Sequence, residues 1–171
     1  SRSRGLGDVY KRQLLFSKSM DHVGVIAKNL NLLDTILPII VKNWKTKQKI
    51  LNEQIVLGIP EGSYLDLAKS NILKQFLGVS KNLETQFEIK KTHLLNNISE
   101  YNDDLDKITF SELYSVHSKW FEKYRNLYKP ISKETIELGK SISTDNLEIL
   151  LKKARITQKY IQSLMLANGI D

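Results

Sequence analysis

Apolar residues recur every three or four positions along four long segments, a spacing typical of amphipathic α-helices. These segments cover residues 23–55, 65–105, 110–142 and 147–164. The alternation of apolar and polar residues that is typical of β-strands is absent from all four. The connections between the segments are short, which makes sequential helices antiparallel. The pattern therefore predicts an all-α fold, an elongated antiparallel up-down bundle of four long helices.

Prolines and glycines interrupt this pattern at a few positions. Pro38 and Pro130 lie inside the first and third segments, where each removes one helix hydrogen bond. The apolar stripe keeps its phase across both, so we expect two of the four helices to be kinked at proline. Gly78 and Gly139 each cost a helix about 1 kcal/mol relative to alanine, and close helix packing would explain them. Residues 58–62, with the sequence GIPEG, predict the turn between the first two helices.

Two capping signals mark the starts of the later helices. Thr109 and Glu112 have the spacing of a capping box and predict that the third helix begins at Thr109. The polar run at residues 102–104 would then end the second helix. Ser143 predicts the N-cap of the fourth helix.

The first residues do not resemble the rest of the chain. Residues 3–13 read SRGLGDVYKRQ, which resembles the translation of adapter DNA from a transposon-based sequencing library. We therefore treat residues 1–13 as a non-native leader. Residues 14–171 are then a single helical bundle domain, either on its own or as a fragment of a longer chain. Without the leader the formal charge falls from +7 to +4, which weakens the case for a nucleic-acid partner.

Few residues offer catalytic or metal-binding chemistry. The chain has no cysteine, which excludes disulfides, cysteine-ligated metals and thiol catalysis. His22, His93 and His117 have no second ligand at the spacing that helical metal sites use. His117 lies on the third apolar stripe, and we expect a hydrogen bond from it to a neighbouring polar group. The acidic run at residues 100–106 lacks the glycine and glutamate of a calcium loop. We therefore expect no catalytic residue, no metal site and no cofactor.

Two surfaces remain as candidate binding faces. An aromatic cluster on the third helix would either fill the core or widen its apolar face enough to bind a partner. This cluster consists of Tyr114, Trp120, Phe121, Tyr124 and Tyr128. Basic residues at i, i+3 and i+7 form either two solvated helix faces or a surface for the backbone of a polyanion. They are Lys42, Lys45 and Lys49 on the first helix, and Lys152, Arg155 and Lys159 on the fourth.

Residues 72–142 resemble phasins, the helical proteins that coat polyester storage granules. The similar stretch is a long amphipathic helix, a short polar break and the segment ITFSELYSVHSKWFEKYRNLYKPISKETIELG at residues 108–139. Phasins have a comparable aromatic residue near the position of Trp120 and Phe121. The resemblance implies that amphipathic helices cover a hydrophobic surface.

These observations favour a binding protein over an enzyme. We expect a non-enzymatic helical interaction or coat protein that binds itself, another helical protein or an apolar granule surface. One alternative is a basic accessory module on the nucleic-acid backbone, and another is a helical auxiliary domain of a larger enzyme. The longest apolar run, residues 36–41, is too short to cross a membrane. We therefore expect no transmembrane segment and a cytoplasmic protein.

Overall fold

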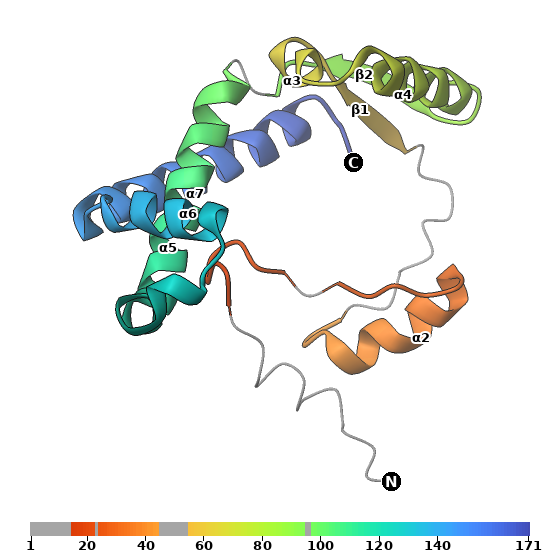
Figure 1. Cartoon of the computed structure of the whole chain (residues 1–171). Helices are drawn as coiled ribbons and strands as arrows, with labels where there is room; N and C mark the ends of the chain where they lie inside the picture. The colour runs from red at the N-terminus through yellow and green to blue at the C-terminus, as the bar shows by residue number, and fades with distance from the viewer. Residues whose placement is uncertain (1–14, 23, 45–54, 95–96) are drawn as a thin grey trace, which may run out of the picture.

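The computed structural model describes residues 15–22, 24–44, 55–94 and 97–171. These residues form six α-helices, one short 3-10 helix and a two-stranded parallel sheet (Figure 1). The prediction of a four-helix bundle without strands is therefore wrong. The predicted leader, residues 1–13, lies outside the described residues. In chain order the elements are α2 (Leu30–Ile40), β1 (Val56–Pro60), α3 (Ser63–Asp66), α4 (Ser70–Leu83), β2 (Glu88–Thr92), α5 (Ile98–Tyr124), η1 (Arg125–Leu127), α6 (Pro130–Lys140) and α7 (Thr144–Ala167).

Residues 56–92 form a βαβ unit, so part of the second predicted helix, residues 65–105, is a strand. β1 and β2 pair in parallel, with Val56 opposite Glu88 and Pro60 opposite Thr92. The connection between them carries α3 and α4. Residues 58–62 were predicted as a turn, but β1 runs through them to Pro60. Each strand has only five residues, and a run of that length cannot be separated from a helix by periodicity alone.

The helix at the place of the third predicted one, α5, begins earlier than the predicted capping box and ends earlier than the apolar stripe of residues 110–142. α5 begins after Asn97, whose side chain accepts a hydrogen bond from the backbone N–H of Glu100. Residues 102–104, predicted as a break, lie inside α5. Thr109 also lies inside α5, where its hydroxyl donates to the carbonyl of Leu105 instead of capping. The predicted capping box is therefore wrong.

The two prolines have different effects on their helices. Pro130 is the first residue of α6, where its missing N–H costs nothing. The chain turns through η1 before it, so α5 and α6 are two helices of a hairpin and not one kinked helix (Figure 1). Pro38 lies inside α2 as predicted, but α2 ends at Ile40. Residues 45–54, the later part of the first predicted helix, lie outside the described residues.

The best-packed part of the described chain is the hairpin of α5 and α6. Leu113, Phe121 and Ile136 form its buried core. Gly139 of α6 lies directly against the backbone of α5, because a Cβ atom there would lie 1.9 Å from the carbonyl oxygen of Phe110. The close packing expected at Gly139 is confirmed, whereas a Cβ atom at Gly78 would meet nothing within 4 Å. α5 and α6 therefore approach backbone to backbone.

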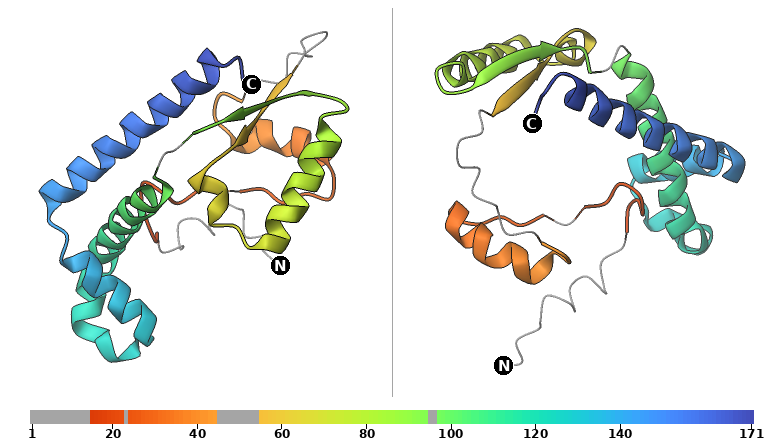
Figure 2. Two further views of the ribbon diagram at one scale, coloured as in Figure 1. Left: turned by 90° about the horizontal axis from the view of Figure 1, so that it is seen from above. Right: turned by 180° about the vertical axis from the view of Figure 1, so that it is seen from behind.

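α7 returns from the hairpin past α5 toward the sheet (Figure 2). Its predicted N-cap is confirmed, because the Ser143 hydroxyl accepts a hydrogen bond from the N–H of Asn146. By contrast, α2 buries none of its residues, although most of them are apolar. Among the described residues, no helix is both long enough and apolar enough to cross a membrane.

Candidate functional site

The hairpin of α5 and α6 divides the predicted aromatic cluster between core and surface. Phe121 is buried, and Tyr114 and Tyr128 pack against the core with it. Trp120 and Tyr124 keep 45% and 43% of their surface exposed. The cluster is therefore neither wholly core nor wholly a binding face.

The exposed members line a shallow hollow at the closed end of the hairpin. We call this surface the hairpin tip; its hollow has a volume of about 410 Å³. Its lining residues are His117, Trp120, Tyr124, Leu127 and Tyr128. Leu127 was placed on the third apolar stripe by its spacing, yet it is 81% exposed. The lining is almost entirely apolar, so the hollow suits an apolar group.

Contacts of the Tyr128 side chain fix the shape of the hollow. Its hydroxyl lies 2.9 Å from His117 Nδ1, which confirms the polar partner expected for this histidine. Its ring meets the buried Phe121 ring nearly at right angles, with centroids 5.3 Å apart. His117 in turn makes an edge contact with Trp120 at 5.7 Å. The hollow is therefore built on the core of the hairpin.

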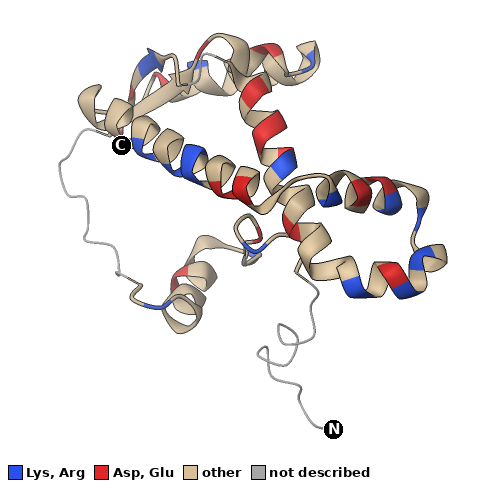
Figure 3. Cartoon of the chain, turned by 90° about the vertical axis from the view of Figure 1, so that its left-hand side faces the viewer, with Lys and Arg blue, Asp and Glu red and all other residues tan. Residues whose placement is uncertain are grey.

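Basic side chains surround the hairpin tip. Lys123 Nζ lies 5.1 Å from the centroid of the Tyr124 ring, a distance at which a cation is attracted to the ring face. Arg125 lies 5.3 Å from the Phe121 centroid and pairs with Glu137 of α6. Figure 3 shows Lys and Arg on both sides of the hairpin turn. An anionic partner would therefore meet favourable charge there.

The predicted basic faces are only partly present. Lys42 follows the end of α2 and does not lie on it, which is contrary to the prediction. Lys45 and Lys49 lie outside the described residues. Exposed basic residues do follow the predicted spacing on α7, namely Lys152, Arg155 and Lys159. Among the described residues, one face of α7 therefore carries what remains of this candidate.

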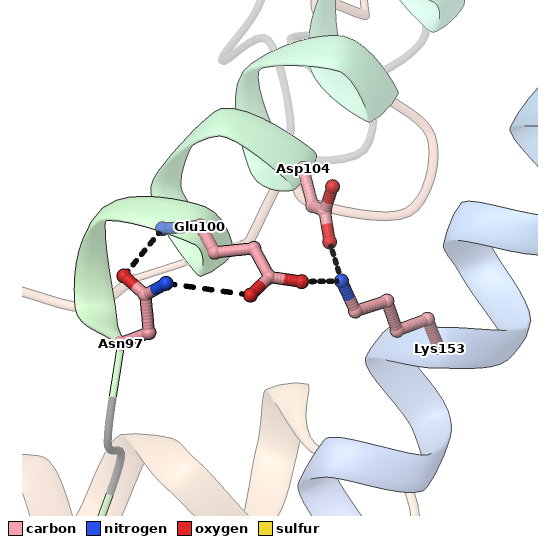
Figure 4. A network of polar contacts seen from close by, with 4 residues as sticks. All are labelled: Asn97, Glu100, Asp104 and Lys153. Atoms are coloured by element: carbon pink, nitrogen blue, oxygen red, sulfur yellow. Dashed lines mark hydrogen bonds and ion pairs between the residues drawn. The ribbon is translucent and has the colours of Figure 1, made fainter.

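A polar network joins α7 to the start of α5 (Figure 4). Lys153 donates a hydrogen bond to Glu100, and its Nζ lies 2.6 Å from Asp104 Oδ2. Hydrogen bonds to Asp104 and then Glu100 raise the pKa of Lys153. Asn97 completes the network by donating to Glu100. Nothing in the spacing of these residues predicts it, because the partners lie on helices far apart in sequence. The network links α7 to α5, although its half-exposed ion pairs contribute little to stability.

A buried carboxylate on α5 holds the segment that precedes α2. Glu112 is 9% exposed and accepts hydrogen bonds from the hydroxyls of Ser17 and Ser19 and from the backbone N–H of Ser19. Burial raises the pKa of Glu112, but these hydrogen bonds outweigh burial and leave the pKa below its ordinary value of 4.5. Glu112 was predicted to be a capping residue, and its actual partners lie more than 90 residues away.

We expect Glu112→Gln to remove the part of the free energy of unfolding that depends on pH in the acidic range. Because the folded state lowers the pKa of Glu112, ionisation stabilises the fold above pH 4.5, and this stability is lost as pH falls through the folded-state pKa. At neutral pH the variant should unfold more easily by about 1–3 kcal/mol. Thermal melts across the acidic range measure both effects, with the exposed Glu122→Gln as the matched control. An unchanged acid profile in Glu112→Gln would contradict the assignment.

The outer edge of β1 already contacts the C-terminal residues. The N–H of Asp171 donates to the Val56 carbonyl at 3.0 Å, and the N–H of Val56 donates to Asp171 Oδ2 at 2.9 Å. Ile170 packs over Gly58, where a Cβ atom would lie 3.0 Å from its side chain. A cavity of about 290 Å³ separates the sheet from α4 and the end of α7. In the described part of the chain, neither strand pairs with anything else along its outer edge beyond these contacts.

The described residues include no group of three or more His, Cys, Asp or Glu side chains that could hold a metal ion.

No protein family model matches this chain. No curated protein matches it either. One similar solved structure, "Crystal structure of amidase", superposes with a TM-score of 0.57 at 14% sequence identity. The likeness covers 64% of this chain and 25% of that chain, so this chain spans about a quarter of that amidase. At this identity the likeness shows a shared fold.

Proposed function

We propose that this chain is a non-catalytic part of a larger amidase-like protein, in which it supplies scaffold to the domain that holds the reacting groups. The observation that carries the proposal is the two-stranded parallel sheet. Parallel strands occur almost only in sheets with both faces covered, and an isolated pair of strands is marginally stable at best. The sheet contacts α4 and the C-terminal residues but has only two strands, and a larger protein of similar fold would add further strands to it.

The likeness to the amidase supports the same interpretation. It extends over most of this chain but only 25% of the amidase. The amidase therefore contains a large part that has no counterpart among the matched residues of this chain. By this argument the chain corresponds to the third possibility that its sequence left open, an auxiliary part of a larger enzyme.

The exposed helix α2 gives independent support. Leu30 and Ile39 are 75% and 80% exposed, and no residue of α2 is buried. Exposed apolar surface of this extent is typical of segments that pack against another part of a protein. The remainder of an amidase-like protein is the partner that we propose for α2.

The two other functions expected from the sequence have less support. A granule coat was inferred from the resemblance of residues 72–142 to phasins and from the apolar face of the third helix, whereas α5 and α6 form a compact hairpin with its own core. A polyanion surface was inferred from basic faces on two long helices, of which the described residues retain the face on α7. Ser17 makes a poor nucleophile, because it is fully buried.

Hydrogen exchange tests this proposal. We expect the backbone amides of β1 and β2 to exchange quickly in the isolated chain, because the sheet lacks neighbouring strands. The centre of α5 around Leu113 should stay protected and serves as the internal control. In the protein translated from the full reading frame around this chain, the strands should become protected and amide hydrolysis should appear.

Two results would contradict the proposal. One is equal protection of the strands in the isolated chain and in the longer protein, which would show that the sheet is complete. The other is hydrolysis of a simple amide by the isolated chain, which would place the reacting groups within it.

A further inference from the structure

The hairpin tip exposes apolar side chains that the fold of the hairpin does not need. Trp120, Tyr124 and Leu127 are all exposed, although Phe121 beside them is buried. Ile131, at the start of α6, is also exposed. Trp120, Tyr124 and Leu127 come from two successive elements, α5 and η1, and line the same hollow. A loose or incomplete core cannot account for them, because Phe121 and Tyr128 fill the core directly below.

The charge around the hairpin tip restricts what could cover it. Residues 119–129 contain four basic side chains and one acidic side chain. Lys119, Lys123 and Lys129 are exposed, and Lys123 lies against the ring of Tyr124. Aromatic and aliphatic residues surrounded by lysine are typical of surfaces that bind the interface of an anionic membrane. Lipid headgroups would pair with the lysines while Trp120 and Leu127 enter the acyl boundary.

The position of the hairpin tip leaves it accessible. Figures 1 and 2 show the closed end of the hairpin on the far side of α5 from the sheet and well away from the C-terminus. Strands added to β1 or β2 would therefore extend the molecule at the other end. In the described part of the chain the hairpin tip is exposed, at the end of the molecule away from the sheet.

We propose that the hairpin tip docks on an anionic lipid surface. Trp120, Tyr124 and Leu127 provide the apolar contact, and Lys119, Lys123 and Lys129 provide the attraction to the headgroups. Tyr128 contacts His117, and His117 contacts Trp120, so Trp120 is held in place before binding and needs little ordering when the surface is met.

Tryptophan fluorescence can locate the contact. The chain contains two tryptophans, Trp44 and Trp120, so Trp44→Phe leaves Trp120 as the single reporter. We expect vesicles of phosphatidylcholine with phosphatidylglycerol to shift its emission to the blue and brominated lipids to quench it. Vesicles of phosphatidylcholine alone should bind at least tenfold more weakly, since each lysine near an anionic surface contributes about 1 kcal/mol.

A pair of leucine variants distinguishes binding through the hairpin tip from nonspecific binding through any exposed apolar residue. Leu127 and Leu166 of α7 have the same exposure, 81%. Leu127→Ser should weaken vesicle binding about tenfold, the equivalent of about 1.4 kcal/mol of lost apolar burial. Leu166→Ser should leave vesicle binding unchanged. Lys129→Glu should weaken it as well, whereas Lys81→Glu at an exposed position of α4 should not.

Three outcomes would overturn this proposal. No blue shift at any lipid concentration would exclude the membrane contact. Equal loss in Leu127→Ser and Leu166→Ser would show that the hairpin tip has no special part in binding. Sedimentation that finds a dimer, which Leu127→Ser converts to a monomer without any vesicle binding, would assign the tip to a second copy of the chain.

Discussion

The Gly139→Ala variant is expected to force α5 and α6 apart. The added methyl group would lie 1.9 Å from the carbonyl oxygen of Phe110 and 2.5 Å from its carbonyl carbon. Both atoms belong to the backbone of α5, so no side-chain rotation can relieve the overlap. Overpacking usually costs about 1–3 kcal/mol, and a collision with rigid backbone should reach or exceed the top of that range. Urea denaturation followed by circular dichroism measures the loss.

Gly78→Ala is the matched control for this variant. It introduces the same methyl group into α4, another helix, where nothing lies within 4 Å. Alanine favours a helix over glycine, so this variant should be more stable by up to about 1 kcal/mol. Opposite signs for the two substitutions are therefore expected. A neutral or stabilising effect of Gly139→Ala would contradict the backbone contact between α5 and α6.

The sequence predicted helices well where local signals and tertiary packing agree. Ser143 caps α7, and the stripe at residues 147–164 lies within a single uninterrupted helix. Gly139 also indicated close helix packing, although the same argument failed at Gly78. These features depend on residues close together in sequence, which is the range over which periodicity and capping are informative.

The strands could not be identified in this way because their spacing fits a helix equally well. Leu83 and Phe87 continue the second apolar stripe, and Phe87 and Ile89 alternate only once before the chain reaches Lys91. What makes residues 88–92 a strand is pairing with residues 56–60, about thirty positions earlier. Such long-range pairing leaves little trace in so short a segment.

The capping box failed for a related reason. Thr109 and Glu112 have the right spacing, but Asn97 begins the helix earlier and Glu112 binds Ser17 and Ser19 instead. A spacing rule cannot reveal that a glutamate has partners far away along the chain. The same limit applies to the network of Lys153, Glu100 and Asp104, which joins two helices.

The candidate site was found in part. The crowding of aromatic residues on the third stripe drew attention to the segment that forms the hairpin tip, and a binding role for it stays a prediction. The stripe assumed one continuous helix through Pro130, and on that assumption Leu127 faces the core. The chain instead turns through η1, which reverses the role of Leu127 and leaves it exposed. The turn decides which aromatic residues face outward.

The pair Phe121→Ala and Trp120→Ala tests that division most directly. These residues are adjacent and both are large, but Phe121 is 6% exposed and Trp120 is 45% exposed. Phe121 packs with Leu113 and Ile136, so its removal should leave a cavity and cost about 3–5 kcal/mol. Trp120→Ala should cost less than about 1 kcal/mol, because its ring contacts only the rim of the core.

Denaturation of both variants in urea gives the comparison, and the slope of the transition shows whether the folded state remains compact. The expected difference between two neighbouring positions is several kcal/mol, far more than the error of the method. It also determines which variant can be used for binding studies. Phe121→Ala would remove vesicle binding by unfolding the hairpin, whereas Trp120→Ala would remove it with the fold intact. Equal losses of stability would mean that Trp120 belongs to the core, and the surface proposed for lipid would then be too small to bind it.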